Sequence, residues 1–242
     1  MKDAYDYACK IYLIHVIKYD FYLRSTLLLI FSDVSYLMKT DDDMYINIKE
    51  LYNLVAANKD PHLLTGALIC GAKPLRDPHN KWHSPYYMYQ ETVYPPYVSG
   101  TGYVMSSSTA LILFKMALTV PAFHLEDVYI TGILPTKVSE FAATRLDLLP
   151  ATGSNKIVIK PKDDYRFSFF LAKNDACIYN KIISSHHLTM NEVRTMYQKV
   201  LNVRSKPEDC PKLKPKQLRP YSPGKCTKSK LNKVMQLKRV RP

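Results

Sequence analysis

The sequence predicts an α/β protein, because short apolar runs that suit buried strands alternate with segments of helical periodicity. Apolar runs at 36–39 and 63–70 favour strands, and helix start signals stand at Asn47 and at 189–192. The chain has 242 residues, of which 47% are hydrophobic. It is therefore long enough to bury a core as one large domain or two small ones.

The chain begins with an apolar and aromatic segment, residues 1–35, whose periodicity does not decide between helix and strand. Tyr36–Lys39 is predicted as a short buried strand that ends at the acidic residues 41–43. Asn47 is then expected to cap a helix that closes before Pro61. The apolar face of that helix would consist of Ile48, Leu51, Leu54 and Val55.

The middle of the chain is predicted to contain a second buried strand at Leu63–Cys70. The stretch from there to Tyr97 is rich in prolines and aromatic residues, which predicts a long ordered loop of the kind that carries binding sites. The run Gly100-Thr101-Gly102 predicts a sharp turn before a strand at Tyr103–Met105.

Helices and strands are expected to alternate again in the second half. Ser107 or Ser108 would cap a helix through Leu118, and Glu126-Asp127 would open a short helix that ends before Pro135. Candidate strands lie at 156–160, 167–171 and 177–183. A capping box at Thr189 to Glu192 precedes apolar residues at helical spacing: Val193, Met196, Tyr197, Val200 and Leu201.

The net charge of +13 comes almost entirely from the C-terminal segment. From Arg204 onward the chain has 13 Lys and Arg but two acidic residues, so residues 1–203 are nearly neutral. Such a tail either binds nucleic acid or anionic lipid, or is simply solvated. It has one aromatic residue, Tyr221, and no recognition motif. We therefore expect a tail that is disordered after Lys206, and no nucleic acid partner.

The five cysteines contain no CxxC pair, which argues against a structural zinc site; they stand at positions 9, 70, 177, 210 and 226. One or two disulfides can form, and their connectivity is not defined by the sequence.

No run reaches the ~18 uncharged apolar residues of a membrane helix. The N-terminus also lacks the pattern of a signal peptide.

Three consecutive carboxylates, Asp41, Asp42 and Asp43, form the first candidate site. They follow a predicted strand, where α/β proteins place ligands, and a divalent cation would relieve their mutual repulsion. Such an ion would neutralise a departing diphosphate. For a lone acidic triplet, however, a solvated acidic turn is the more common explanation.

Three other groups are candidates for chemistry. Glu126-Asp127 offers a general base, or merely acidic charge at a helix start. His186-His187 offers imidazole to a carboxylate metal site, or is an ordinary surface pair. Trp82 and the aromatics at 94–97 either stack on a sugar or uracil ring or fill the core.

Four stretches, taken together and in this order, resemble the β1,3-glycosyltransferases of glycosyltransferase family 31. They are YLMKTDDDMYIN at 36–47, YPPYVSGTGYVMS at 94–106, LEDVYITG at 125–132 and HHLTMNE at 186–192. One such motif is a weak signal, whereas four at suitable separations are strong. The resemblance covers roughly residues 30–203.

The resemblance implies a GT-A fold, a UDP-sugar donor, an acceptor glycan, and Mn²⁺ or alternatively Mg²⁺. Asp41 and Asp43 match the outer positions of the DxD motif and His186 the metal-ligand histidine, with His187 as the fallback. Asp127 matches the catalytic base, with Glu126 as its neighbour. The implied donor-binding residues are Asp41, Asp42, Trp82, Tyr97, Gly100 and Gly102.

The chain also departs from the family pattern. Because the DxD motif lies only about forty residues from Met1, we expect the first βα region to be truncated or divergent, with a poor match at 19–31. Val98 replaces a cysteine, so Cys177 is expected to lack its usual partner. The expected division is a remnant of the donor-binding half at 1–35, a catalytic domain at 36–203 and a basic tail at 204–242.

Two functional hypotheses follow from the resemblance. The first is an inverting, metal-dependent hexosyltransferase that forms a β1,3-linkage, placed in the Golgi lumen of a type II membrane protein whose anchor this chain lacks. The second is a catalytically inactive relative that binds a glycan or a partner protein. Neither the donor sugar, the acceptor nor the oligomeric state is defined by the sequence.

Overall fold

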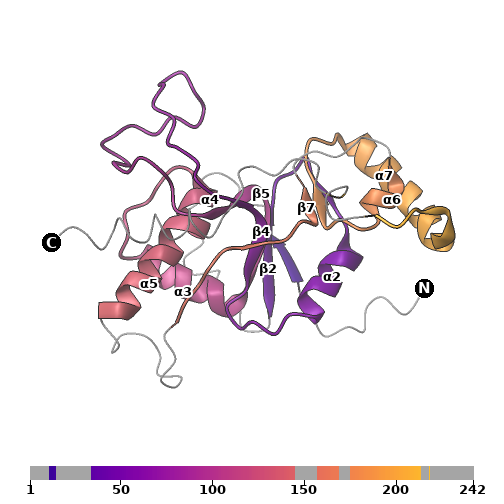
Figure 1. Ribbon diagram of the computed structural model, residues 1–242, viewed down its shortest axis with the longest axis horizontal. Coiled ribbons are helices and arrows are strands. Elements are labelled where there is room, and N and C mark those ends of the chain that lie inside the picture. Colours follow the sequence, from indigo (N-terminus) through magenta and orange to yellow (C-terminus); the bar gives the residue numbers. More distant parts are fainter. Residues whose placement is uncertain (1–10, 15–33, 145–156, 169–174, 214–217, 219–242) are drawn as a thin grey trace.

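A mixed five-stranded sheet forms the centre of the protein (Figure 1). The computed structural model describes residues 11–14, 34–144, 157–168, 175–213 and 218. The strand order is β1-β2-β5-β4-β6, and the strands are β1 (Ile11–Ile14), β2 (Tyr36–Thr40), β4 (Leu64–Ile69), β5 (Tyr97–Ser106) and β6 (Lys162–Asp163). β1 runs parallel to β2, and β6 runs parallel to β4. The long strand β5 is antiparallel to both of its neighbours, β2 and β4.

Helices cover both faces of this sheet, which confirms the α/β prediction (Figure 1). Successive side chains of a strand point to opposite faces, so Leu37 and Met38 enter two different cores. Leu37 packs with residues of α3 (Ser107–Ala117) and α5 (Leu134–Thr144). Met38 packs with residues of α2 (Ile48–Ala56).

The predicted cap of α2 is confirmed, because the Asn47 side chain accepts a hydrogen bond from the Glu50 amide at 3.3 Å. Leu51 and Val55 are buried as expected, but Ile48 in the first turn is 48% exposed. Ser106, the residue before the two predicted serines, caps α3 through the Thr109 amide.

A second, three-stranded sheet carries the C-terminal part of the site. Its order is β3-β8-β7, with β3 at Tyr45–Ile46, β7 at Phe167–Ser168 and β8 at Ser184–Ser185. α6 (Ala176–Tyr179) and α7 (Met190–Ser205) pack beside it around a third core. The predicted capping box of α7 is present, whereas only Met196 and Val200 of its expected apolar face are fully buried.

The helical stretch after Leu125 is longer than predicted. α4 (Glu126–Val128) continues into a π-helical turn, η2 (Tyr129–Ile133), and then into α5. Pro135 therefore does not end the helix. It is the second residue of α5 and directly follows the π-helical turn, in which the Leu134 amide donates to the Tyr129 carbonyl.

Three other local predictions were wrong. Gly100-Thr101-Gly102 lies inside β5 and makes no turn. Residues 177–183 begin as helix α6 rather than strand, because the Asp175 side chain accepts hydrogen bonds from the amides of Cys177 and Ile178. Residues 157–160 contain no strand. Of the strand predicted at 167–171 the structure describes 167 and 168, and these do form strand β7.

The start of the segment predicted to be disordered is ordered. Pro207–Asp209 forms the 3₁₀ helix η3, and Cys210 makes a disulfide with Cys177. Cys177 thus pairs with Cys210, while position 98, where its usual partner would stand, is valine; Cys70 is disulfide-bonded as well. Closing a loop with a sequence separation of 33 stabilises the fold by about 4 kcal/mol in the chain-entropy picture.

Within the described residues, no helix is both long enough and apolar enough to cross a membrane.

Candidate functional site

Asp41 leaves the central sheet at the carboxyl end of β2 and is held there by Lys39. The Lys39 ammonium lies 2.5 Å from Oδ1 of Asp41 and also donates to the carbonyl of Gly100 on the neighbouring strand β5. The amide of Asp41 donates to the carbonyl of Thr101 at 3.3 Å. The first acidic residue is thus fixed against the middle of β5.

The same part of β5 holds Asp127. The Gly100 amide donates to Oδ2 of Asp127 at 3.0 Å, and the Val128 amide donates to Oδ1 at 2.8 Å. A Cβ at position 100 would lie 3.3 Å from both Cβ and Oδ2 of Asp127. Glycine at 100 therefore serves close approach of the carboxylate rather than a turn.

Burial raises the pKa of Asp127, while the two amides and Lys39 act in the opposite direction. The result is a carboxylate that is more basic than an exposed aspartate. Its two amide bonds fix the position of the carboxylate.

Glu126 lies beside Asp127 but has different partners. The Tyr103 hydroxyl donates to its Oε1, and Lys39 lies 3.8 Å from its Oε2. Burial raises the pKa of Glu126, and it also raises the pKa of the Tyr103 hydroxyl well above its usual value. Tyr103 therefore remains a neutral donor, and Glu126 lies between the Tyr103 hydroxyl and the Lys39 ammonium.

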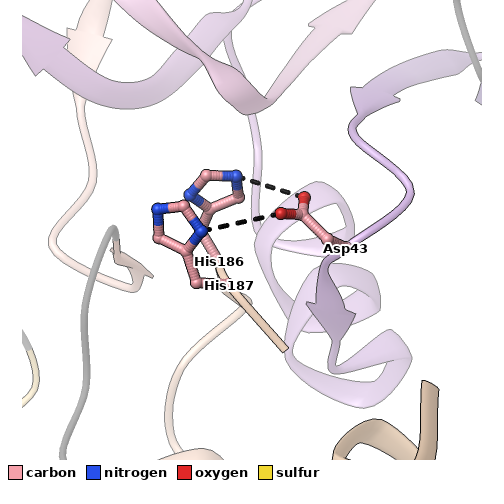
Figure 2. A group of neighbouring side chains, drawn as sticks. All are labelled: Asp43, His186 and His187. Carbon is pink, nitrogen blue, oxygen red and sulfur yellow. Dashed lines mark ion pairs between the residues drawn. The ribbon is translucent and has the colours of Figure 1, made fainter. Parts of the chain in front are cut away.

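Asp43, His186 and His187 form a second cluster, shown in Figure 2. Nε2 of His186 lies 3.1 Å from Oδ1 of Asp43, and Nδ1 of His187 lies 3.8 Å from Oδ2. One ligand atom from each residue lies within 4.8 Å of the others, so the three fit a single divalent cation. Burial is the main cause that lowers the pKa of His186, and a lowered pKa favours the neutral imidazole, the form that binds metals.

The acid pair Glu126-Asp127 and the Asp43–His186–His187 cluster form one electrostatic unit, in the sense that the charge of Asp41 acts on both. The charge of Asp41 raises the pKa of Glu126 on one side and opposes the lowering of the His186 pKa on the other. Lys39 acts on Asp127 in the same way as on Glu126, lowering both pKa values. Removing the charge of Asp41 should therefore change the pKa values of both Glu126 and His186.

The structure brings together some of the predicted residues and leaves others apart. Asp43 joins His186, whereas Asp41 pairs with Lys39 and lies outside the three-residue cluster. Asp42 is exposed in the intervening turn. Gly102 faces the Met38 side chain, with 3.5 Å between a Cβ there and Cε of Met38.

The predicted loop after β4 is ordered, as expected, and carries Trp82. Arg76 ties the loop together by donating to the carbonyls of Ser84, Tyr89 and Glu91. Trp82 is 52% exposed, with the Lys81 ammonium 4.3 Å above its ring. Tyr97, at the start of β5, is partly buried, and its pKa is raised by burial and by the charge of Asp127.

Lys39 was missed as a site residue. A lysine inside an otherwise apolar strand, two positions before a carboxylate, was the available signal. Its contact with Gly100 spans 61 positions of the chain, which no local pattern reveals.

A mixed α/β fold with a partly buried acid pair and a carboxylate–histidine cluster suits an enzyme that combines acid–base chemistry with a bound cation. The sequence model of the galactosyltransferase family matches residues 15–140. The chain therefore belongs to the galactosyltransferase family, a family of glycosyltransferases, and the resemblance to glycosyltransferase family 31 is confirmed. The match includes residues 19–31, which were expected to match poorly.

Curated relatives agree with this assignment. β-1,3-Galactosyltransferase 2 of Homo sapiens is 34% identical over 163 residues, which cover 66% of this chain and 35% of the relative. β-1,3-Galactosyltransferase 1 of Mus musculus is 30% identical over 169 residues, which cover 69% of this chain and 45% of the relative. The chain thus spans less than half the length of these relatives.

Proposed function

We propose that this chain carries the catalytic domain of an inverting β1,3-hexosyltransferase that moves a sugar from a UDP-sugar to an acceptor glycan. UDP-galactose is the first donor to test, because the relatives are named β-1,3-galactosyltransferases. The domain would have the GT-A architecture over residues 36–203. A Golgi lumenal location is part of the same proposal and rests on family membership.

The observation that carries the proposal is the setting of Asp127. Its carboxylate is fixed by the Gly100 and Val128 amides, and burial raises its pKa. A general base works best when its pKa lies near the working pH and its position is fixed. Glu126 is engaged by Tyr103 and Lys39, so Asp127 is the better candidate for the base.

The chemistry is a single displacement. Asp127 takes the proton of an acceptor hydroxyl as that oxygen forms a bond to the anomeric carbon of the donor. The bond from the anomeric carbon to the phosphate oxygen breaks, and UDP leaves with its electron pair. Because the new bond forms on the face opposite the leaving group, the configuration inverts.

The donor side would be formed by the acidic turn and the histidine cluster. Asp43 and His186, with Asp41 close by in the same electrostatic unit, would hold Mn²⁺, or alternatively Mg²⁺. Such an ion, when bound, supplies positive charge to the departing diphosphate. Asp42, Trp82, Tyr97, Gly100 and Gly102 stay predictions as donor contacts.

The test combines turnover and binding. The chain is incubated with UDP-galactose, Mn²⁺ and a panel of galactose- and N-acetylhexosamine-terminated acceptors, and released UDP is measured. In parallel, UDP is titrated calorimetrically with and without Mn²⁺. The proposal expects turnover with at least one acceptor, and UDP binding that needs metal and is lost in Asp43→Ala.

Metal-dependent UDP binding without turnover on any acceptor would favour the inactive relative instead. Equal UDP binding with and without metal would contradict the proposed donor site.

A further inference from the structure

The second sheet places His187 opposite Asp43. β3 and β8 are antiparallel, with Tyr45 paired to Ser185 and Ile46 to Ser184. Continuing that register toward the acidic turn sets Asp43 across from His187. The Leu188 amide donates to the Asp43 carbonyl at 3.1 Å, so the backbones remain joined at this point.

The backbone at His187 brings both rings to one side. Adjacent residues of an extended strand point to opposite faces, so two neighbouring histidines would not normally face one carboxylate. His187 has a φ of 63°, and it is the single non-glycine residue with positive φ in the part of the chain that the structure describes. This left-handed conformation turns its ring back beside His186, with 3.9 Å between ring centroids (Figure 2).

A non-glycine residue in the left-handed region costs on the order of 1 kcal/mol and persists where the surroundings hold it. Here the result is one carboxylate and two imidazoles that converge from two segments far apart in the sequence. The cluster thus offers two imidazole nitrogens and one carboxylate, whereas hard cations prefer sites made of oxygen ligands.

We propose that His187 is a second imidazole ligand and that it makes the site selective for transition-metal ions over Mg²⁺ and Ca²⁺. Mg²⁺ and Ca²⁺ prefer oxygen ligands, whereas imidazole suits ions such as Co²⁺ and Zn²⁺ and is accepted by Mn²⁺. The proposal deepens the proposed function, since the same ion would face the donor diphosphate. Ion binding itself can be measured without any nucleotide.

The test is titration of the full chain with Co²⁺, Zn²⁺, Mn²⁺ and Mg²⁺ in the absence of UDP, by calorimetry and, for Co²⁺, by its visible absorption. His187→Asn is the decisive variant, because asparagine tolerates the left-handed backbone but lacks the imidazole. His79→Ala, an exposed histidine of the loop after β4, is the matched control. Circular dichroism checks that each variant is folded.

The wild type should bind Co²⁺ and Zn²⁺ more tightly than Mg²⁺. His187→Asn should weaken Co²⁺ and Zn²⁺ binding by at least about tenfold, as loss of even indirect support for a metal ligand does. It should change Mg²⁺ binding little, and His79→Ala should change neither. Unchanged Co²⁺ binding in His187→Asn, or an equal loss for all four ions, would overturn the proposal.

Failure of this proposal is distinguishable from failure of the proposed function. If His187→Asn leaves both metal-dependent UDP binding and Co²⁺ affinity unchanged, His187 is not a ligand, and the proposed transferase function is unaffected. Selective Co²⁺ binding that is lost in His187→Asn, without any sugar transfer, would support the second ligand and contradict the transferase function.

Discussion

The ammonium group of Lys39 lies 2.5 Å from Asp41 and 3.8 Å from Glu126, so one cation links the acidic turn after β2 to the acid pair of α4. The Lys39 side chain is 13% exposed, against 40% for Asp41. A charge this deeply placed is retained because carboxylates and a carbonyl satisfy it.

Replacing Lys39 by methionine should therefore destabilise the protein by about 1–3 kcal/mol, because Asp41 and Glu126 lose their shared cation. Chemical denaturation measures the change. Lys39→Arg, which keeps the charge, should recover part of the loss. An unchanged denaturation midpoint in Lys39→Met would show that the link contributes nothing.

Asp127→Asn should lower kcat by about 10²–10⁴-fold, because the amide cannot take the acceptor proton. Metal-dependent UDP binding should persist, since Asp127 lies outside the Asp43 cluster. Steady-state kinetics and calorimetry of the same preparation test both parts. Glu140→Gln, a change on the outer surface of α5, is the control, and comparable activity in Asp127→Asn would remove Asp127 from the mechanism.

The pH profile should reflect the raised pKa of Asp127. The base acts when ionised, so kcat/KM should fall as pH drops through that raised pKa, at a higher pH than for an exposed aspartate. Rates measured between pH 4 and 9 on one acceptor, at saturating metal, give the profile. The acidic limb should vanish from the residual activity of Asp127→Asn, and an acidic limb that persists there belongs to another group.

Gly100→Ala should reduce kcat without unfolding the chain. The new Cβ would lie 3.3 Å from Oδ2 of Asp127, which is tight enough to displace the carboxylate by a few tenths of an ångström. Misplacement of a catalytic group on that scale costs activity far more than stability. Thermal melts of Gly100→Ala, measured beside its kinetics, separate the loss of activity from any loss of stability. Full activity in Gly100→Ala would mean that close approach at 100 is not required.

The parts of the fold that the sequence predicted correctly depend on local signals. Both the strand at Tyr36–Thr40 and the capping box of α7 can be recognised from a short run of neighbouring residues. Gly100 was misinterpreted because glycine serves equally for a turn and for close approach, and the approaching group, Asp127, is 27 positions away. α6 was missed because the Asp175 cap outweighs a sequence that is otherwise favourable for a strand.

The candidate site divides in the same way. Its acidic and histidine members were named from motifs, whereas Lys39 and Tyr103 act through contacts between distant segments. The pairing of β3 with β8, which assembles the histidine cluster, involves two strands of two residues each, too short to be recognised by periodicity.

The Cys177–Cys210 bond makes a covalent ring that contains His186, His187 and the whole of α7. A single protease nick inside this ring leaves both pieces attached to one another, so the histidines stay tethered to the body that carries Asp43. Such a nicked molecule migrates as one species without reductant and as two fragments with it. If the nick lies between Cys177 and His186, purification under reducing conditions would therefore separate both histidines from Asp43.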